Sequence, residues 1–249
     1  MIFGTISYSV YSINFVLASV MLLFTSYLDL KDREVPDKVW LIFGGIGGVL
    51  QAYEVLNGET NLVQLVIAVI LGTVVGMGLF FFGFYGGADG KALIVLGLLV
   101  PHFNPMIGLY SIAPLMILTN GVLISILLPV GLLIYNTILL VRKRPIFEGF
   151  EEPLYRKILA CLLGYKQTGK QREFQFSMEK TIHREDGTGE DAKKFDFSLI
   201  QDDFETKSGT WVTPGIPLLV FFTAGYFALL FYGDLVIGLI QFFSRLFGF

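Results

Sequence analysis

The chain is dominated by apolar stretches long enough to cross a lipid bilayer. A helix needs about 20 mostly apolar residues to span the hydrocarbon layer. Five or six segments are candidates, at about 8–28, 39–55, 62–84, 89–100, 106–141 and 214–247. Only 16% of the residues are charged, whereas soluble domains carry about 25%. The sequence therefore predicts an α-helical polytopic membrane protein with six transmembrane helices.

The fourth of these segments is unusually short. Asp89 to Val100 is twelve residues, or roughly 18 Å of helix, while the hydrocarbon layer is about 30 Å thick. Two interpretations remain open. Either the helix continues past a kink at Pro101 and Pro105, or it begins below the membrane surface.

The positions of Lys and Arg predict the orientation. With the N-terminus outside and six alternating helices, 17 of the 18 Lys and Arg residues fall on the cytoplasmic side and only Arg245 lies outside. Cytoplasmic loops carry an excess of these residues. We therefore expect a multi-pass protein of the cell membrane with both termini outside.

A polar segment interrupts the apolar stretches and predicts a small cytoplasmic β-containing domain between helices five and six. The expected organisation is residues 1–141 for five helices, 142–211 for this domain and 212–249 for the last helix. Apolar and polar residues alternate in "REFQFSMEK" and "KKFDFSLI", on either side of the turn-rich "REDGTGED". A period of two around a turn predicts a β-hairpin. Before it, "PLYRKILACLLG" has helical spacing and is a candidate for a helix on the membrane surface.

Two aspartates lie at the ends of predicted membrane helices. Asp29 closes the first in "SYLDLKDREVPD", and Asp89 opens the fourth in "GGADGK". The second helix leads the chain away from this membrane face and the third brings it back, so both acids are expected at the same face. Simple structural roles exist, since Asp89 suits an N-cap and Asp29 a helix end. Acids at membrane depth are nevertheless functional candidates by default.

The chemistry open to two neighbouring carboxyl groups is specific. Held close together, they resist double ionisation and share one proton. The ionised group accepts a proton from a water molecule as that water attacks a peptide carbonyl, and the protonated group donates to the developing oxyanion. Such a pair can hydrolyse a peptide bond without a metal, another cofactor or a covalent intermediate, provided that the first and fourth helices pack together.

Both stretches resemble the signatures of a family of membrane proteases. "GGADGK" resembles the motif of the GxGD aspartyl proteases, and "DLKDREVPD" resembles the other catalytic stretch of the type IV prepilin peptidases, archaeal preflagellin peptidases above all. The resemblance implies that Asp29 and Asp89 are the catalytic pair. The residues that complete the two motifs are Gly86, Gly87, Ala88, Lys91 and Pro36. The implied reaction is removal of the short basic leader from archaellin or type IV pilin-like precursors at the cytoplasmic face.

The sequence departs from the family in two respects. Ala88 stands where the motif has glycine, and alanine disfavours a positive φ. The four-cysteine zinc insert and the N-methylation of bacterial relatives have no counterpart, because Cys161 is the single cysteine. We therefore expect peptidase activity without methyl transfer. Cys161 is expected to be an apolar packing residue.

Several other polar residues receive weaker assignments. Asp32, Glu34 and Asp37 are candidates for binding the basic leader, although a solvated loop of mixed charge is the simpler alternative. His102 and His183 lie on opposite predicted sides, which excludes a metal site shared between them. The second helix carries four glycines that neighbouring helices can approach closely, namely Gly44, Gly45, Gly47 and Gly48.

Two other functions remain open from the sequence. A presenilin-like intramembrane protease shares the GxGD motif but normally has more helices and a Pro-Ala-Leu element, which this chain lacks. A small cation- or proton-coupled transporter would use the two aspartates as ion ligands, although such sites usually lie near the bilayer midplane. Besides the precursor, membrane lipid is the expected partner. The net charge of −3 gives no reason to expect nucleic acid, and the oligomeric state is left open.

Overall fold

The computed structural model describes residues 2–81, 86–103, 111–168, 174–182, 192–197 and 209–248. The chain forms two compact units. One comprises Met1–Ile124 together with Pro217–Phe249, and the other comprises Ser125–Ile216.

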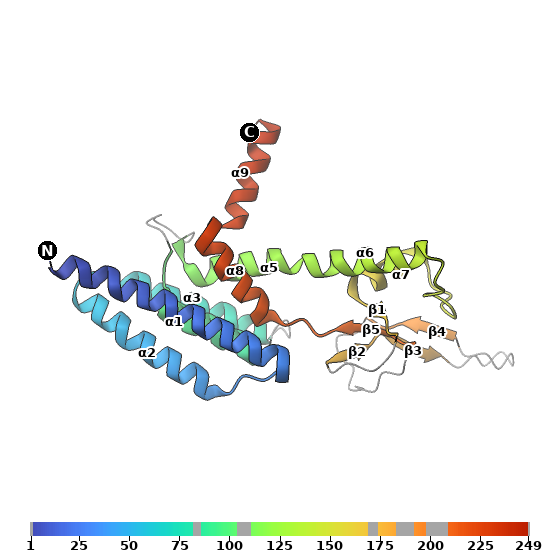
Figure 1. The fold of residues 1–249 in the computed structure, drawn as a ribbon, viewed down its shortest axis with the longest axis horizontal. Coiled ribbons are helices and arrows are strands. Elements are labelled where there is room, and N and C mark those ends of the chain that lie inside the picture. The colour runs from blue at the N-terminus through green and yellow to red at the C-terminus, as the bar shows by residue number, and fades with distance from the viewer. Residues whose placement is uncertain are drawn as a thin grey trace. The chain divides into compact units, whose positions relative to one another are not determined.

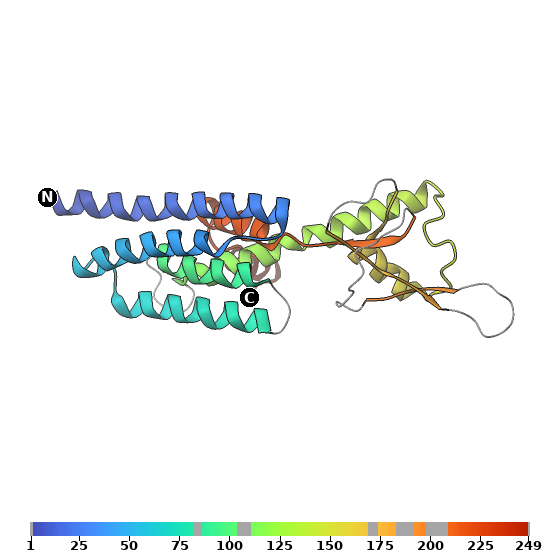
Figure 2. The same ribbon diagram turned by 90° about the horizontal axis from the view of Figure 1, so that it is seen from below.

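The first unit is built of helices that bring the two ends of the chain together. Its elements are α1 (Ile2–Asp32), α2 (Asp37–Leu56), α3 (Leu62–Phe81), α4 (Gly87–Leu99), α5 (Ala113–Ser125), α8 (Leu218–Tyr232) and α9 (Leu235–Phe247). Helices α1 to α4 lie alongside one another (Figure 1, Figure 2). Helix α4 is mostly buried, and Leu22, Leu96 and Phe222 from three different helices meet in one apolar core. The core therefore joins the N-terminal helices to α8 near the C-terminus.

Several of these helices are suited to a bilayer by length and composition. Among the described residues, Ser12–Asp32, Asp37–Leu56 and Ala113–Val141 are long and apolar enough to cross a membrane, and the pair α8 and α9 passes the same test if it counts as one span. A mostly helical membrane protein with a small β-containing part agrees with the prediction. Six spans remain a prediction, because α3 contributes only a shorter apolar stretch, Leu62–Gly78.

The last predicted helix, at about 214–247, is divided in two. Helices α8 and α9 meet at an angle of 57°. Gly233 has φ 86°, which ends α8, and the Asp234 Oδ1 accepts hydrogen bonds from the backbone of Val236 and Ile237 to cap α9. A glycine at positive φ is typical of the end of one helix, and an N-cap residue directly after it is typical of the start of the next. The expectation of one continuous helix was therefore wrong.

Helix α4 ends before the proline that follows it. Its last residue is Leu99, and Val100 has φ −135° and ψ 77°. This conformation is expected because a proline disfavours helical geometry in the residue before it. Continuation of the helix past a kink at Pro101, one of the two interpretations of this short segment, is therefore wrong.

Glycines allow α3 and α4 to pack backbone against backbone. A Cβ atom placed on Gly76 would lie 2.8 Å from the carbonyl oxygen of Gly90, and one on Gly97 would lie 3.1 Å from that of Ala68. Such small residues are typical of close helix pairs in membranes. The approach of these two helices positions the first turn of α4, which carries Asp89.

Polar contacts hold α1 against α8. The hydroxyls of Ser26 and Thr223 lie 2.6 Å apart, and Ser26 also donates to the carbonyl of Leu219. Further along α1, the Tyr226 hydroxyl donates to the carbonyl of Phe15 at 2.7 Å. Because these groups are largely buried, each hydrogen bond replaces one that water would otherwise supply. The C-terminal part of α1 is thereby fixed in place.

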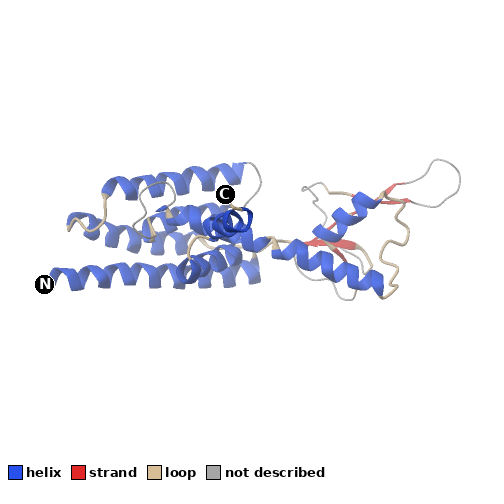
Figure 3. Cartoon of the chain, turned by 90° about the horizontal axis from the view of Figure 1, so that it is seen from above, coloured by secondary structure: helices blue, strands red, loops and turns tan. Residues whose placement is uncertain are grey.

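The second unit combines two helices with two small antiparallel sheets (Figure 3). Its elements are α6 (Leu127–Val141), α7 (Leu154–Leu163), β1 (Tyr165–Lys166), β2 (Gln175–Ser177), β3 (Glu179–Ile182), β4 (Ala192–Phe195) and β5 (Trp211–Pro214). One sheet has the order β1-β5-β2, and the other pairs β3 with β4. Trp211 is fully buried between the rings of Phe147 and Phe195. The predicted boundaries at residues 142 and 211 stay a prediction, while α6 packs Leu133 and Leu139 onto this core.

The predicted β-hairpin is confirmed for one pair of strands, β3 and β4. Strands β3 and β4 are antiparallel, with Lys180 opposite Lys194, and the turn "REDGTGED" lies outside the described residues. The first predicted strand is in fact two strands, because β2 leaves the hairpin to pair with β5. The predicted helix in "PLYRKILACLLG" is confirmed as α7, and its place on the membrane surface stays a prediction.

Candidate active site

Asp29 lies in the last turns of α1, next to an arginine that turns back toward it. Arg33 has φ 55° and follows the end of the helix. Its Nη1 lies 3.9 Å from the Asp29 Oδ1, and both side chains are mostly buried. A positive φ in a non-glycine residue is uncommon and needs local support. The ion pair with Asp29 supplies part of that support.

Asp89 lies in the first turn of α4 and stabilises its start. Gly86 is the N-cap, and the Asp89 Oδ2 accepts a hydrogen bond from the Gly86 backbone N–H at 3.0 Å. The side chain thus reaches back to the cap residue, as in a capping box. Asp89 is 8% exposed. The expected N-cap role was wrong in position, since Asp89 is the third residue of the helix rather than its cap.

Ala88 is accommodated without strain. It belongs to α4, and the non-glycine residues with positive φ in the described chain are Arg33, Lys143 and Phe174. Right-handed helical geometry suits alanine better than glycine. The departure from the GxGD motif therefore carries no conformational penalty here.

The structure brings Asp29 and Asp89 to the same end of the helical unit. Helices α1 and α4 are in contact, and the Asp89 carboxyl experiences the charges of both Asp29 and Arg33. Two acids far apart in the sequence thus interact electrostatically in a largely buried setting. A cluster of two carboxyls and one guanidinium is suited to proton transfer to and from a water molecule.

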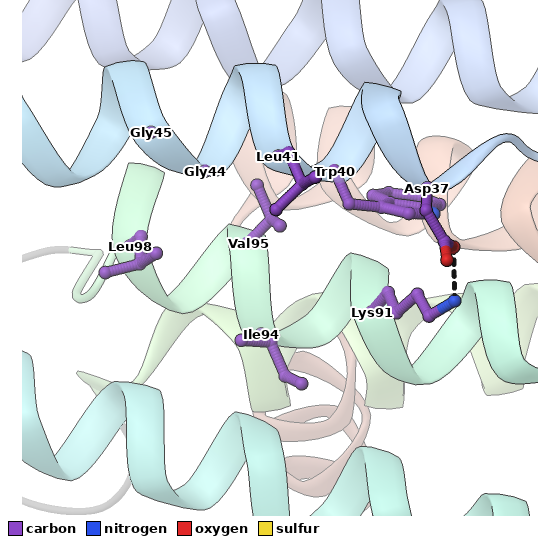
Figure 4. Close-up of a pocket in the computed structure, with 9 residues that line it drawn as sticks. All are labelled: Asp37, Trp40, Leu41, Gly44, Gly45, Lys91, Ile94, Val95 and Leu98. Carbon is purple, nitrogen blue, oxygen red and sulfur yellow. Dashed lines mark hydrogen bonds and ion pairs between the residues drawn. The ribbon is translucent and has the colours of Figure 1, made fainter.

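The residues around the two motifs join the starts of α2 and α4. Pro36 is the N-cap of α2. Lys91 forms an ion pair with Asp37, the first residue of α2, with Nζ and Oδ1 2.5 Å apart (Figure 4). Gly87 lies near the Phe80 ring of α3. Gly86 and Lys91 are exposed beside the buried Asp89.

The other two acids of the first loop are exposed. Asp32 lies 3.7 Å from the Nζ of its neighbour Lys31, and Glu34 is exposed. An exposed carboxylate remains accessible to a basic peptide, which is compatible with the predicted role. Their assignment to leader binding stays a prediction.

The single cysteine is a packing residue, as predicted. Cys161 is buried in the core of the second unit, and burial raises the pKa of its thiol to about 11. A thiol with such a pKa holds little reactive thiolate at neutral pH. His183 lies outside the described residues, and among the residues that the structure describes no group of three or more His, Cys, Asp or Glu side chains is placed to hold a metal.

Two of the four glycines of α2 face α4, and the other two face no described residue. A Cβ on Gly47 would lie 2.8 Å from a Leu99 side-chain atom, and one on Gly44 would contact Val95, so these two positions allow α4 to approach. Gly45 and Gly48 would meet nothing within 4 Å among the described residues. The predicted close-packing surface is thus confirmed for half of the four.

Sequence reasoning missed two charged residues. Arg33 follows Asp29 by four positions, a helical spacing that predicts an ion pair, so the signal was present. Glu54 is 3% exposed and accepts hydrogen bonds from Asn14 and Thr60. Asn14 precedes Asp29 by fifteen residues, or roughly 22 Å of helix, so Glu54, near the end of α2, contacts the middle of α1 far from Asp29. In the sequence, the only signal for Glu54 is its position near the end of an apolar segment.

The comparisons with known proteins agree on one family. Residues 16–134 match the type IV leader peptidase family. The preflagellin peptidase of Methanocaldococcus jannaschii is 30% identical over 244 residues, which cover 91% of this chain and 97% of that protein. The preflagellin peptidase of Methanococcus voltae is 27% identical, with 88% of this chain and 94% of that protein covered. That of Methanococcus maripaludis is 25% identical, with 90% and 97% covered.

Proposed function

Because the chain belongs to the type IV leader peptidase family, we propose that it is a membrane endopeptidase that removes the leader from preflagellin or type IV pilin-like precursors. The relatives named preflagellin peptidase match it over nearly the full length of both chains. Membership supports a protease that cleaves leader peptides. The catalytic residues, the membrane face and the absence of methyl transfer are our further proposals.

What supports the catalytic assignment is that Asp29 and Asp89 lie at the ends of two helices in contact, α1 and α4, with the charge of Asp29 acting on the Asp89 carboxyl. In the proposed reaction, one carboxyl is ionised and the other protonated. The ionised group takes a proton from water as the water oxygen attacks the scissile carbonyl, while the protonated group donates to the oxyanion. The C–N bond then breaks, and the amine of the mature protein leaves with a proton returned by the dyad.

We place the reaction at the cytoplasmic membrane face, in a protein of six spans with both termini outside. The support is the distribution of Lys and Arg, of which 17 of 18 fall on one side. Acids at the membrane boundary are well placed to meet both water and a peptide that enters from the lipid. Asp32, Glu34 and Asp37 are exposed around the start of α2 and would attract a basic leader.

We further propose that the enzyme does not transfer methyl groups. The support is the single cysteine of the chain, which cannot form a four-cysteine zinc site. The relatives that match nearly the whole chain are preflagellin peptidases, which favours this function over the presenilin-like and transporter alternatives.

The decisive experiment replaces each aspartate by asparagine. Purified Asp29→Asn and Asp89→Asn variants in detergent or nanodiscs are incubated with a precursor that carries a basic leader, and the cleaved product is quantified. Loss of a general acid or base costs about 10²- to 10⁴-fold in rate, so each variant is expected to lose at least that much. Glu59→Gln, at an exposed acid in the loop between α2 and α3 that has no part in the proposed site, is the control and should process normally. Wild-type rates in either dyad variant would refute the catalytic assignment.

A further inference from the structure

The start of α7 borders a polar pocket of about 460 Å³. Among the residues that the structure describes, its charged lining consists of three basic and two acidic side chains, namely Arg156, Lys180, Lys194, Glu152 and Asp196. Glu152 and Arg156 neutralise each other, because the Glu152 Oε2 lies 2.8 Å from the Arg156 Nε. Within this lining the two lysines then stand against one acid, Asp196, so the pocket carries an excess of positive charge.

The two lysines of the pocket face each other across the strand pair β3 and β4. Lys180 lies directly opposite Lys194 in the antiparallel register, and both side chains are exposed. Directly opposite side chains share one face of the strand pair at about 5 Å, and like charges in that position repel. Within the described part of the chain these two lysines form no ion pair, whereas the neighbouring Lys193 pairs with Glu179, with Nζ and Oε2 3.1 Å apart. An anion bound between Lys180 and Lys194 would relieve their repulsion.

The exposed side chains of α7 are all apolar or aromatic. They lie at five positions of this helix, which we call its outer face, namely Leu154, Tyr155, Ile158, Leu159 and Leu163. The basic residues of the helix turn toward their own unit instead, since Arg156 and Lys157 each lie over a phenylalanine ring of that unit. A surface helix of a soluble protein shows the opposite pattern, with polar residues outside. The outer face of α7 is therefore suited to a bilayer surface.

Helix α7 is tied to a candidate membrane span. The buried Asn136 side chain of α6 donates hydrogen bonds to the carbonyl oxygens of Cys161 and Gly164 at the end of α7, at 3.0 and 2.7 Å. Asn136 lies in the candidate span Ala113–Val141, about 7.5 Å of helix before its end. The basic run 142–144 follows directly, which is typical of the cytoplasmic boundary of a membrane helix. The end of α7 therefore lies near the depth of that boundary.

Charge and apolar surface together select one occupant. A phospholipid carries a phosphate for the lysine pair and acyl chains for the outer face of α7, whereas a soluble anion matches only the pocket. Tyr155 joins the two parts, because it lines the pocket and is exposed on α7. Basic residues at the cytoplasmic boundary of a membrane attract anionic lipids in particular. The tie of α7 to a membrane span favours lipid over an acidic protein as the partner.

We infer that Lys180 and Lys194 bind the phosphate of an anionic phospholipid while the outer face of α7 enters the bilayer surface. The second unit is then held on the membrane at two points, the end of the span and this lipid site. The site involves neither Asp29 nor Asp89 and goes beyond the proposed peptidase function, so either proposal can fail without the other.

The first test measures lipid binding to the full-length protein. The protein in detergent is titrated with phosphatidylglycerol or phosphatidylcholine, and bound lipid is counted by native mass spectrometry. Phosphatidylglycerol should bind more tightly, and Lys180→Gln or Lys194→Gln should each raise its Kd about fivefold, the effect of one basic residue at an anionic surface. Lys166→Gln, at a lysine of the same unit that does not line the pocket, is the control and should leave the Kd unchanged.

Inorganic phosphate separates a lipid site from a site for any anion. It should not displace phosphatidylglycerol from the wild type at equal concentration, because it lacks the acyl chains that contact α7. Displacement of the lipid by equal phosphate would overturn the inference, as would the same Kd in the wild type and both pocket variants. Lys180 and Lys194 are exposed, so their replacement does not disturb the core of the unit.

A fluorescent label reports whether α7 enters the bilayer. Ile158→Cys is labelled in nanodiscs that contain phosphatidylglycerol, and Cys161 is buried and does not compete. Brominated lipid should quench this label and aqueous iodide should not, whereas a label on Glu148→Cys, at an exposed acid of the same unit, should show the reverse. Equal quenching of both labels by iodide would refute the inference. A label at Ile158→Cys that neither reagent reaches would refute it as well and indicate a protein partner on the outer face.

Discussion

The side chain of Asp89 has two roles in our proposal. It stabilises the start of α4 and it takes part in the reaction. Its carboxylate accepts the Gly86 backbone N–H at the start of α4, and the same group experiences the charges of Asp29 and Arg33. A hydrogen-bond acceptor at this position stabilises the start of α4, while an ionisable group is required only by the proposed proton transfer. Substitutions therefore separate the two roles.

Asp89→Asn and Asp89→Ala should differ in stability but not in activity. The asparagine keeps an oxygen that accepts the Gly86 N–H, whereas the alanine loses the capping interaction, which costs about 1 kcal/mol. We expect both variants to be inactive and only Asp89→Ala to show a clearly lower melting temperature in detergent. Equal melting temperatures for the two would show that the capping contact contributes nothing.

The sequence contained most of the residue-level signals. The motif stretches identified both aspartates, and the i,i+4 spacing of Asp29 and Arg33 was visible. Two details depended on backbone geometry. The position of Asp89 within the first turn of α4 depends on where that helix begins, at Gly87, and the conformation of Ala88 follows from it.

Between elements, the closest packing is that of α3 on α4. The backbone of Gly76 faces that of Gly90, and there is no room for a side chain between them. This contact holds the helix that carries Asp89, so its disruption should affect both stability and processing. The same helix offers a matched position, since Gly78 has nothing within 4 Å of its Cβ direction among the described residues.

Gly76→Ala should destabilise the protein, whereas Gly78→Ala should not. A Cβ at position 76 would lie 2.8 Å from the Gly90 carbonyl oxygen, so the two backbones must separate, and overpacking of this kind costs about 1–3 kcal/mol. At position 78 alanine only improves helix propensity. Thermal unfolding in detergent and precursor cleavage measure both effects. A Gly76→Ala protein as stable and active as Gly78→Ala would contradict the packing argument.

Element boundaries were predictable where a local signal was strong. Pro101 accounts for the end of α4. Gly233 and Asp234 account for the break between α8 and α9, although the sequence analysis predicted a single helix there. The pairing of β2 with β5 was not predictable. It joins Phe176 to Thr213 across a long stretch of sequence, and no local pattern specifies such a partner.

For the whole molecule, the membrane orientation makes the most direct prediction. Glu34 lies in the loop between α1 and α2, and Glu59 lies in the loop between α2 and α3; both are exposed. If the N-terminus is outside, the first loop is cytoplasmic and the second faces outward. The orientation decides on which side of the membrane precursors would be cut.

Single cysteines at the two positions report the orientation. A membrane-impermeant maleimide added to intact cells should label Glu59→Cys at once and Glu34→Cys only after permeabilisation. Background from Cys161 should be low, because that thiol is buried and its pKa is raised to about 11. The reverse pattern would move the proposed site to the outside, while Asp29 and Asp89 would still share one face.

The amino-acid sequence alone determined the class of molecule, the approximate helices and the two acids proposed as the catalytic pair. Apolar length, charge distribution and helix-end residues act locally, so they can be read without knowledge of the fold. Only the tertiary structure decided that Asp29 and Asp89 lie on helices in contact, α1 and α4, and that Gly76 faces Gly90. These features depend on how distant segments pack, and packing is set by the shapes of both surfaces at once, which no single stretch of sequence contains.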